Sequence, residues 1–203
     1  MYNYSAETKY SDKIPKSMLE NESSEIKIFC KKNVILHIES ESKTTGIILD
    51  GTAFLISINR NGEESILDYY EKGDIFGNRF CPQNIVNLYD VIARNDCEVL
   101  LFQNDLYHNS TDINNFLNDV TIKNIQRTHM HIDILSQRSI REKIIKYLQY
   151  NVLLQKKNNI ILPMSLSELA GYLAIDRSAM MRELKKLNNE NIIISKGQKI
   201  TLL

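Results

Sequence analysis

The segment 164–187, MSLSELAGYLAIDRSAMMRELKKL, constrains the fold of this chain more than any other stretch. Ser165 and Glu168 have the spacing of a capping box, in which the serine hydroxyl and the carboxylate each accept a hydrogen bond from the other residue's amide. We therefore expect a helix to begin directly after the serine. Asp176 is a suitable N-cap for a second helix that begins at Arg177. The segment thus predicts two short helices joined by a tight turn.

Each predicted helix has one apolar stripe at the spacing of a helical face. The two stripes consist of Leu166, Leu169, Ala170 and Leu173, and of Met180, Leu184 and Leu187. Small residues at Ala170, Gly171 and Ala174 would let the two helices approach closely. These features predict a helix-turn-helix.

A different face of the second helix is mostly polar and basic, and we call it the basic face. It consists of Arg177, Ser178, Met181, Arg182 and Lys185. The face starts at the helix N-terminus, the end that a recognition helix directs at base edges in the major groove. The same residues would also suit the solvated side of an ordinary amphipathic helix, so the helix alone leaves both interpretations open.

The residues that follow favour nucleic-acid binding. Residues 191–202, NIIISKGQKITL, read as strand, Lys-Gly turn and strand, which is a small hairpin. A helix-turn-helix followed by a hairpin is a winged helix. Lys196 and Lys199 on this wing would contact phosphates.

The distribution of charge agrees with this interpretation. The chain has 25 Lys and Arg and 25 Asp and Glu, so its net charge is zero. Residues 138–203, however, contain 12 basic and 5 acidic residues, whereas the preceding 137 residues contain 13 and 20. A basic module attached to an acidic one is typical of a nucleic-acid-binding module joined to a module that does not bind nucleic acid.

Upstream of this module, the chain has short apolar or alternating runs separated by turns. These runs are 26–29, 34–38, 46–49, 53–58, 65–70, 91–93 and 99–102. Asn61-Gly62 is a strong signal for a type I′ hairpin turn, and Lys72-Gly73-Asp74 marks another turn. Many short strands without long helices between them predict an antiparallel β roll, or jelly roll. The whole chain is therefore expected to be α+β.

A long helix is predicted from residue 111 to about residue 136. It has two apolar stripes, and a helix that is apolar on two sides needs two partners. We expect the roll to cover one stripe and the same helix of a second subunit to cover the other. We assign Ile113, Leu117 and Val120 to the dimer contact. A further helix, 140–154, would pack under the helix-turn-helix, which gives three domains: 1–110, 111–137 and 138–203.

Several other classes of protein are disfavoured. The three cysteines are scattered, which argues against a disulfide framework, and no run is apolar and long enough to span a membrane. The N-terminus has no apolar segment of a signal peptide, so a cytoplasmic location is expected. The roll contains too few histidines for an enzyme of the cupin type. We expect no enzymatic activity, no bound metal and no cofactor.

In its order of parts, the chain resembles the Crp/Fnr family of bacterial transcription regulators. The motifs that carry the resemblance are Ile48-Leu49-Asp50-Gly51, Asn61-Gly62-Glu63-Glu64, Gly73-Asp74-Ile75-Phe76-Gly77, Asp96-Cys97-Glu98-Val99 and Leu166-Ser167-Glu168-Leu169-Ala170, together with Arg177 and Arg182. The resemblance implies a cyclic-nucleotide-binding type of roll, a dimerisation helix and a winged helix that binds palindromic double-stranded DNA. It also implies RNA polymerase as a partner.

The resemblance implies roles for individual residues in DNA binding. Arg177 and Arg182 match the arginines that contact bases and phosphates, and Ser165 matches an N-cap residue that also contacts a phosphate. We assign Ser167 to the same DNA-binding set. The family often has Glu where this chain has Ser178, so the preferred operator should differ from that of the cyclic-AMP-dependent members.

The effector site departs from the family pattern. We place an effector pocket at Phe76, Gly77, Asn78, Arg79, Tyr89 and Arg127. The ribose-binding Glu of the family is replaced by Asn78, and the phosphate-binding Arg-Ser-Ala aligns with Asn87, Leu88 and Tyr89. Without the arginine, a buried phosphate would lack a charged partner. We therefore expect that cyclic AMP does not bind tightly, and that the effector, if there is one, is another small molecule. The alternatives are a DNA binder that needs no ligand and an adaptor that uses the winged helix for protein contacts.

Overall fold

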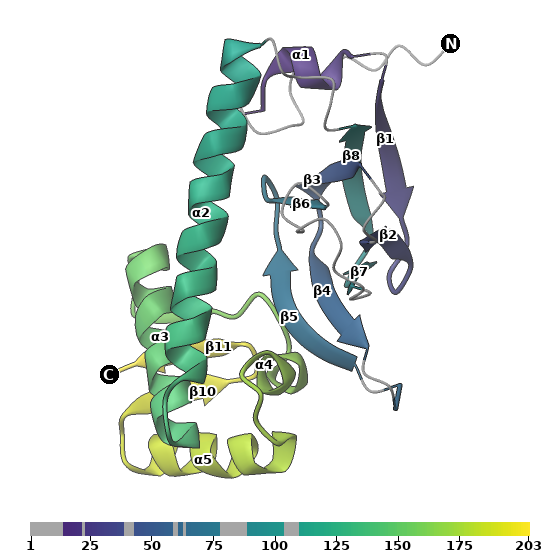
Figure 1. The fold of residues 1–203 in the computed structure, drawn as a ribbon. Coiled ribbons are helices and arrows are strands. Elements are labelled where there is room, and N and C mark those ends of the chain that lie inside the picture. Colours follow the sequence, from purple (N-terminus) through teal and green to yellow (C-terminus); the bar gives the residue numbers. More distant parts are fainter. Residues whose placement is uncertain are drawn as a thin grey trace. The chain divides into compact units, whose positions relative to one another are not determined.

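The computed structural model describes residues 14–21, 23–38, 43–58, 61–62, 64–77, 89–103 and 110–203. The chain divides into two compact units, Met1–Ile125 and Gln126–Leu203, and each unit is described by itself. The division falls within the long helix α2, Thr111–Leu135, whose limits agree with the predicted ones (Figure 1).

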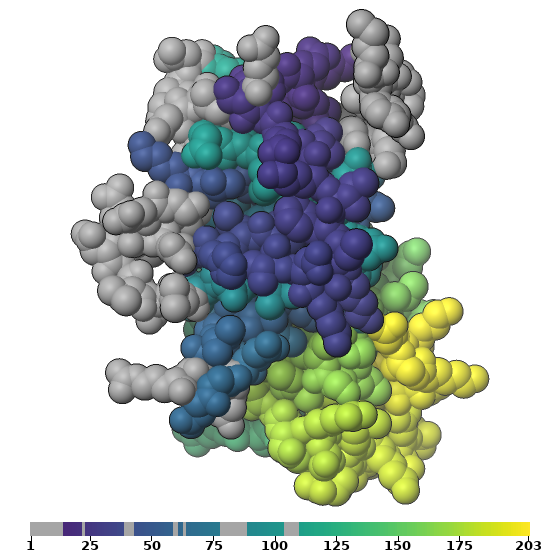
Figure 2. Space-filling view, turned by 90° about the vertical axis from the view of Figure 1, so that its right-hand side faces the viewer, coloured from purple at the N-terminus to yellow at the C-terminus, as the bar shows by residue number. Residues whose placement is uncertain are grey.

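The first unit contains two four-stranded antiparallel sheets, with the strand orders β1-β8-β3-β6 and β2-β7-β4-β5. The elements are α1 (Lys16–Leu19), β1 (Ser24–Phe29), β2 (Val34–Ile38), β3 (Thr44–Asp50), β4 (Ala53–Ile58), β5 (Glu64–Tyr70), β6 (Ile75–Gly77), β7 (Tyr89–Ala93) and β8 (Cys97–Gln103). The predicted roll is confirmed, and β6 is a strand that sequence patterning missed. Strand β1 lies on the outside of the roll (purple in Figure 2).

The core of the roll has two layers, and β3 contributes to both. Ile48 is fully buried between the sheets, next to Val91 and Val99. Its neighbours Ile47 and Leu49 point to the other face of the sheet, because side chains alternate along a strand. There they pack against α1 and the first half of α2. Every residue from Thr45 to Leu49 is therefore buried, which explains the continuous apolar run of β3.

The dimer assignment needs a correction. Ile113, Leu117 and Val120 are only 2 %, 1 % and 8 % exposed, because they cover the apolar face of the β1-β8-β3-β6 sheet within the same subunit. They cannot form a surface for a partner. The exposed apolar residues on this part of α2 are Ile122 and Ile125, at 55 % and 49 %. Periodicity found two stripes, but it could not tell which one faces the roll.

The second unit is a winged helix. It contains the end of α2, α3 (Ile140–Gln155), β9 (Asn159–Ile161), α4 (Leu166–Tyr172), α5 (Arg177–Asn189), β10 (Ile193–Lys196) and β11 (Lys199–Leu202). The predicted helices and the hairpin are confirmed. Strand β9 was not predicted; it pairs with β11 and completes a three-stranded sheet of order β10-β11-β9.

Two further observations concern one turn of the roll and the length of the helices. Gly62, the second residue of the predicted Asn61-Gly62 turn between β4 and β5, has a left-handed φ of 79°. Among the residues that the structure describes, no helix has both the length and the apolar character that crossing a membrane requires.

Candidate nucleic-acid interface

Helix α4 begins with the capping box that the sequence predicts. The Ser165 hydroxyl accepts a hydrogen bond from the Glu168 amide at 3.3 Å, and the Ser165 amide donates to the Glu168 carboxylate at 2.6 Å. These bonds satisfy amides that have no partner within the helix. Ser165 is half-buried and Ser167 is exposed, so both hydroxyls lie near the start of α4 and one of them faces solvent.

The turn between α4 and α5 is tight. Ala174 has a left-handed φ of 51°, which brings the Ile175 amide to within 2.9 Å of the Ala170 carbonyl oxygen. Asp176 then caps α5, because its carboxylate accepts from the Ala179 amide at 2.8 Å. The turn therefore sets the angle at which α5 leaves α4, as the capping pattern predicts.

Helix α5 is buried on one side and open on the other. Met180, Leu184 and Leu187 are 0–3 % exposed and pack inside the unit. All five residues of the basic face are exposed, including Met181 at 44 %. Figure 2 shows α5 and the wing, in yellow-green and yellow, at the surface of their unit. The basic face is thus available to a ligand.

The wing is anchored to the end of α5. Lys196 and Lys199 pair at the tip of the hairpin around Gly197, whose φ is 59°, and both lysines are exposed. The Asn188 side chain accepts from the Ser195 amide at 2.9 Å and donates to the Ser195 hydroxyl at 2.7 Å. The wing cations therefore keep a defined position relative to α5.

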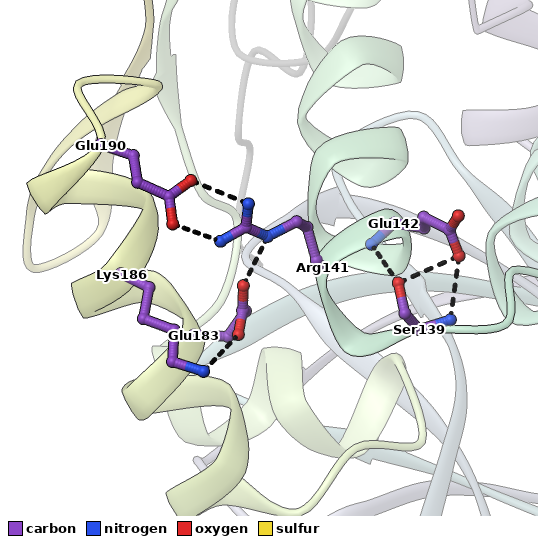
Figure 3. A network of polar contacts seen from close by, with 6 residues as sticks. All are labelled: Ser139, Arg141, Glu142, Glu183, Lys186 and Glu190. Carbon is purple, nitrogen blue, oxygen red and sulfur yellow. Dashed lines mark hydrogen bonds and ion pairs between the residues drawn. The ribbon is translucent and has the colours of Figure 1, made fainter.

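An ion-pair network that sequence reasoning missed joins α3 to α5 (Figure 3). The Nε of Arg141 donates to Glu183 at 2.7 Å, and its two terminal nitrogens donate to Glu190 at 2.8 and 2.7 Å. These hydrogen bonds hold the pKa of Glu190 below its usual value and raise the pKa of Arg141. Because the partners are 42 and 49 residues apart, no local pattern indicates the network.

The end of α2 is bonded to the winged helix within the second unit. The Asp133 carboxylate accepts hydrogen bonds from the Tyr150 hydroxyl and, at 3.0 Å, from Lys146, and these bonds lower its pKa. The ring of His131 stacks on Tyr172, with 3.8 Å between centroids, and its Nε2 lies 2.8 Å from the Tyr172 carbonyl oxygen. This part of α2 is therefore firmly attached to α3 and α4.

Of the residues assigned to the effector pocket, Phe76, Gly77 and Tyr89 are described in the first unit, and Arg127 is described in the second. Asn78 and Arg79 lie outside the described residues. Phe76 is fully buried in the roll, while Tyr89 and Arg127 are half-buried. Gly77 has a φ of 118°, and a side chain there would meet the Thr44 carbonyl oxygen at 2.6 Å, so this glycine serves close backbone packing.

A hollow of about 980 Å³ lies elsewhere in the first unit, between α1, the β5–β6 turn and α2. Its lining includes Lys16, Lys72, Phe116 and Lys123, and none of the residues that we assigned to the effector pocket. Among the described residues, no three His, Cys, Asp or Glu side chains are arranged to hold a metal ion.

Comparisons with known proteins agree with this architecture. Residues 26–109 match the family model of the cyclic nucleotide-binding domain. No curated protein sequence matches the chain. Among solved structures, FixK2 from Bradyrhizobium japonicum has a TM-score of 0.69 at 18 % identity, covering 88 % of this chain and 92 % of its own.

Two other solved structures are similar. A cyclic nucleotide-binding domain-containing protein from Listeria monocytogenes has a TM-score of 0.75 at 16 % identity, covering 92 % of this chain and 94 % of its own. A transcriptional regulator of the CRP family from Thermus thermophilus has a TM-score of 0.64 at 17 % identity, covering 87 % and 91 %. The chain therefore has a cyclic nucleotide-binding type of domain and the fold of the Crp/Fnr transcription regulators.

Proposed function

We propose that this protein is a homodimeric transcription regulator that binds double-stranded DNA with α5 in the major groove. The observation that carries the proposal is the exposed basic face of α5, presented by a capped helix-turn-helix and flanked by the lysines of the wing. Arg177 stands at the N-terminal end of α5, the end from which recognition helices contact bases. The similar fold of known regulators supports the same conclusion.

Dimerisation would make the DNA site symmetric. Ile122 and Ile125 are exposed large hydrophobic residues three positions apart on α2, and Ile132, 59 % exposed, follows seven positions later on the same helical face. A stripe of this kind on a long helix is typical of a helix–helix interface. Two α5 helices related by a two-fold axis would enter successive major grooves about 34 Å apart.

The proposed regulator does not depend on cyclic AMP. The basis is the sequence around the expected phosphate site, where Asn87, Leu88 and Tyr89 offer no cation. Any effector would be a different small molecule, and RNA polymerase would be the partner at a promoter.

One observation favours a second candidate, a DNA binder that needs no effector. Lys123 on α2 forms an ion pair of 2.6 Å with Asp74, which is 1 % exposed, and Asn124 donates to the Ile75 carbonyl oxygen at 3.0 Å. These contacts hold the first half of α2 on the roll through the chain's own residues. Calorimetry with cyclic AMP and other metabolites, with and without DNA, separates the two candidates.

Selection of bound duplexes from a random DNA pool tests the proposal. We expect the pool to converge on a palindrome, and its affinity for the protein should fall steeply with salt, with log K falling by about 0.9 per log unit of salt for each phosphate neutralised. A pool that does not converge, or affinity that does not depend on salt, would favour the protein-interaction adaptor.

A further inference from the structure

Arg141 occupies a position that its own helix does not favour. It is the second residue of α3, and the N-terminus of a helix carries a partial positive charge of roughly half a unit, which repels a cation. The start of α3 is already stabilised by the capping box of Ser139 and Glu142 (Figure 3). The role of Arg141 therefore depends on the residues that it contacts in other elements.

Its hydrogen bonds are with Glu183 of α5 and with Glu190, the C-cap residue of that helix. Arg141 bonds to Glu183 in the middle of α5 and, through both terminal nitrogens, to Glu190 at the end. The two glutamates are seven residues apart, so their backbone positions are separated by about 10 Å along the helix axis, while their carboxylates converge on one guanidinium. Glu183 is only 15 % exposed, and it is the one acidic residue within α5. One guanidinium thus holds α5 at two points, two turns apart.

Apolar packing on one side of α5 fixes its rotation less sharply than hydrogen bonds of defined geometry do. The contacts of Met180, Leu184 and Leu187 stabilise burial, but the hydrophobic effect is not directional. Side-chain tips lie roughly 6 Å from a helix axis, so a rotation of about 20° would move them by about 2 Å. A bidentate contact to a base does not tolerate such a shift, because its hydrogen bonds need 2.7–3.2 Å. The attraction of a cation to a phosphate changes much more gradually with distance.

We propose that Arg141 is a positioning residue for sequence specificity: by holding Glu183 and Glu190 it sets the rotation of α5, and thereby the base contacts of Arg177 and Arg182. This inference rests on the proposed function. Arg141 itself does not contact DNA. Its loss therefore lowers discrimination between sequences and leaves the general attraction to DNA nearly intact.

The test compares two duplexes of equal length, the selected palindrome and a scrambled sequence, by fluorescence anisotropy at fixed salt. In Arg141→Met, the affinity for the palindrome should fall about tenfold or more, while the affinity for the scrambled duplex changes less than about threefold. In Arg141→Lys, most of the loss should remain, because an ammonium cannot form the three fork-shaped hydrogen bonds. Lys157→Met, an exposed charge change on the same unit, is the matched control and should discriminate like the wild type.

The specificity ratio separates this role from a general loss of stability, because a smaller folded fraction weakens binding to both duplexes equally. Glu190→Gln keeps the contact of Arg141 with Glu183 and serves as the second variant if Arg141→Met does not fold. Glu190→Gln should lower the specificity ratio. A double variant that combines Arg141→Met with Glu190→Gln should lower this ratio no further than Arg141→Met alone does. An unchanged ratio in Arg141→Met or, if that variant does not fold, in Glu190→Gln would overturn the inference. A wild type that prefers neither duplex would instead overturn the proposed function.

Discussion

The basic residues of the proposed interface differ in the part of the DNA that each would contact. An arginine can bond the O6 and N7 of guanine at once, whereas a lysine acts as a point charge on a phosphate. Arg177 lies at the exposed start of α5, and Lys199 lies at the exposed tip of the wing. These two cations should therefore contribute to binding in different ways.

Replacing Arg177 by alanine should reduce discrimination between sequences. We expect a loss of about 1–3 kcal/mol on the selected palindrome and a much smaller loss on random DNA, measured by anisotropy with both duplexes. Lys27→Ala on β1 removes one exposed cation from the roll and should change neither value. Equal losses on both duplexes would contradict a base-reading role for Arg177.

Replacing Lys199 by alanine should weaken binding to every duplex by a similar factor. Because one phosphate contact is lost, the slope of log K against log salt should become shallower by about 1. Titrations at four or more salt concentrations measure this slope. A variant with an unchanged slope would place Lys199 away from the phosphates.

At the level of elements, the junction between α2 and α3 combines three kinds of contact. Tyr150 and Lys146 of α3 bond to Asp133, and His131 stacks on Tyr172 at the end of α4. The pKa of Asp133 is lowered, first by the hydrogen bond from Tyr150 and then by Lys146. A lowered pKa in the folded state means that the ionised carboxylate stabilises the fold.

This stabilisation should depend on pH in one direction. It is fully present above the unfolded pKa of about 3.9 and is lost as the pH falls through the lower, folded pKa. Asp133→Asn should therefore unfold at a lower temperature than the wild type at pH 7, and the difference should shrink below about pH 4. Tyr150→Phe should show the same trend with a smaller effect. Melting curves by circular dichroism at pH 7 and pH 3 measure both, and a difference independent of pH would refute the role of the ionised form.

At the level of the whole molecule, the proposed dimer depends on which face of α2 is free. The stripe of Ile113, Leu117 and Val120 belongs to the core of the roll, so a charge at Val120 is expected to unfold the roll. Ile122 and Ile125 are exposed large hydrophobic residues farther along the same helix. They are the positions at which a charge should affect association and spare the fold.

Ile122→Asp and Ile125→Asp should shift the protein from dimer to monomer. For a residue near the centre of an interface, the dissociation constant should rise about 30-fold or more, which sedimentation equilibrium can measure. Ile28→Asp on β1 is the control, because Ile28 is 76 % exposed and lies on another element. An unchanged sedimentation mass for both α2 variants would exclude this face as the dimer interface.

The sequence by itself determined the elements whose signals are local. The capping pairs Ser165–Glu168 and Asp176–Ala179 set the starts of α4 and α5, and both caps form as predicted. The separation of apolar and basic residues on α5 followed from helical periodicity alone. The β roll was predictable because short apolar runs and turn residues alternate along the chain.

Only the tertiary structure decided the features that join distant segments. Strand β9 is three residues long and exists because β11 offers it a pairing edge. The apolar face of β3 and β8 decided which stripe of α2 is buried. Arg141 contacts glutamates that are 42 and 49 residues away in the sequence. Local patterns report the conformation of a segment, whereas these contacts depend on which surfaces the folded chain brings together.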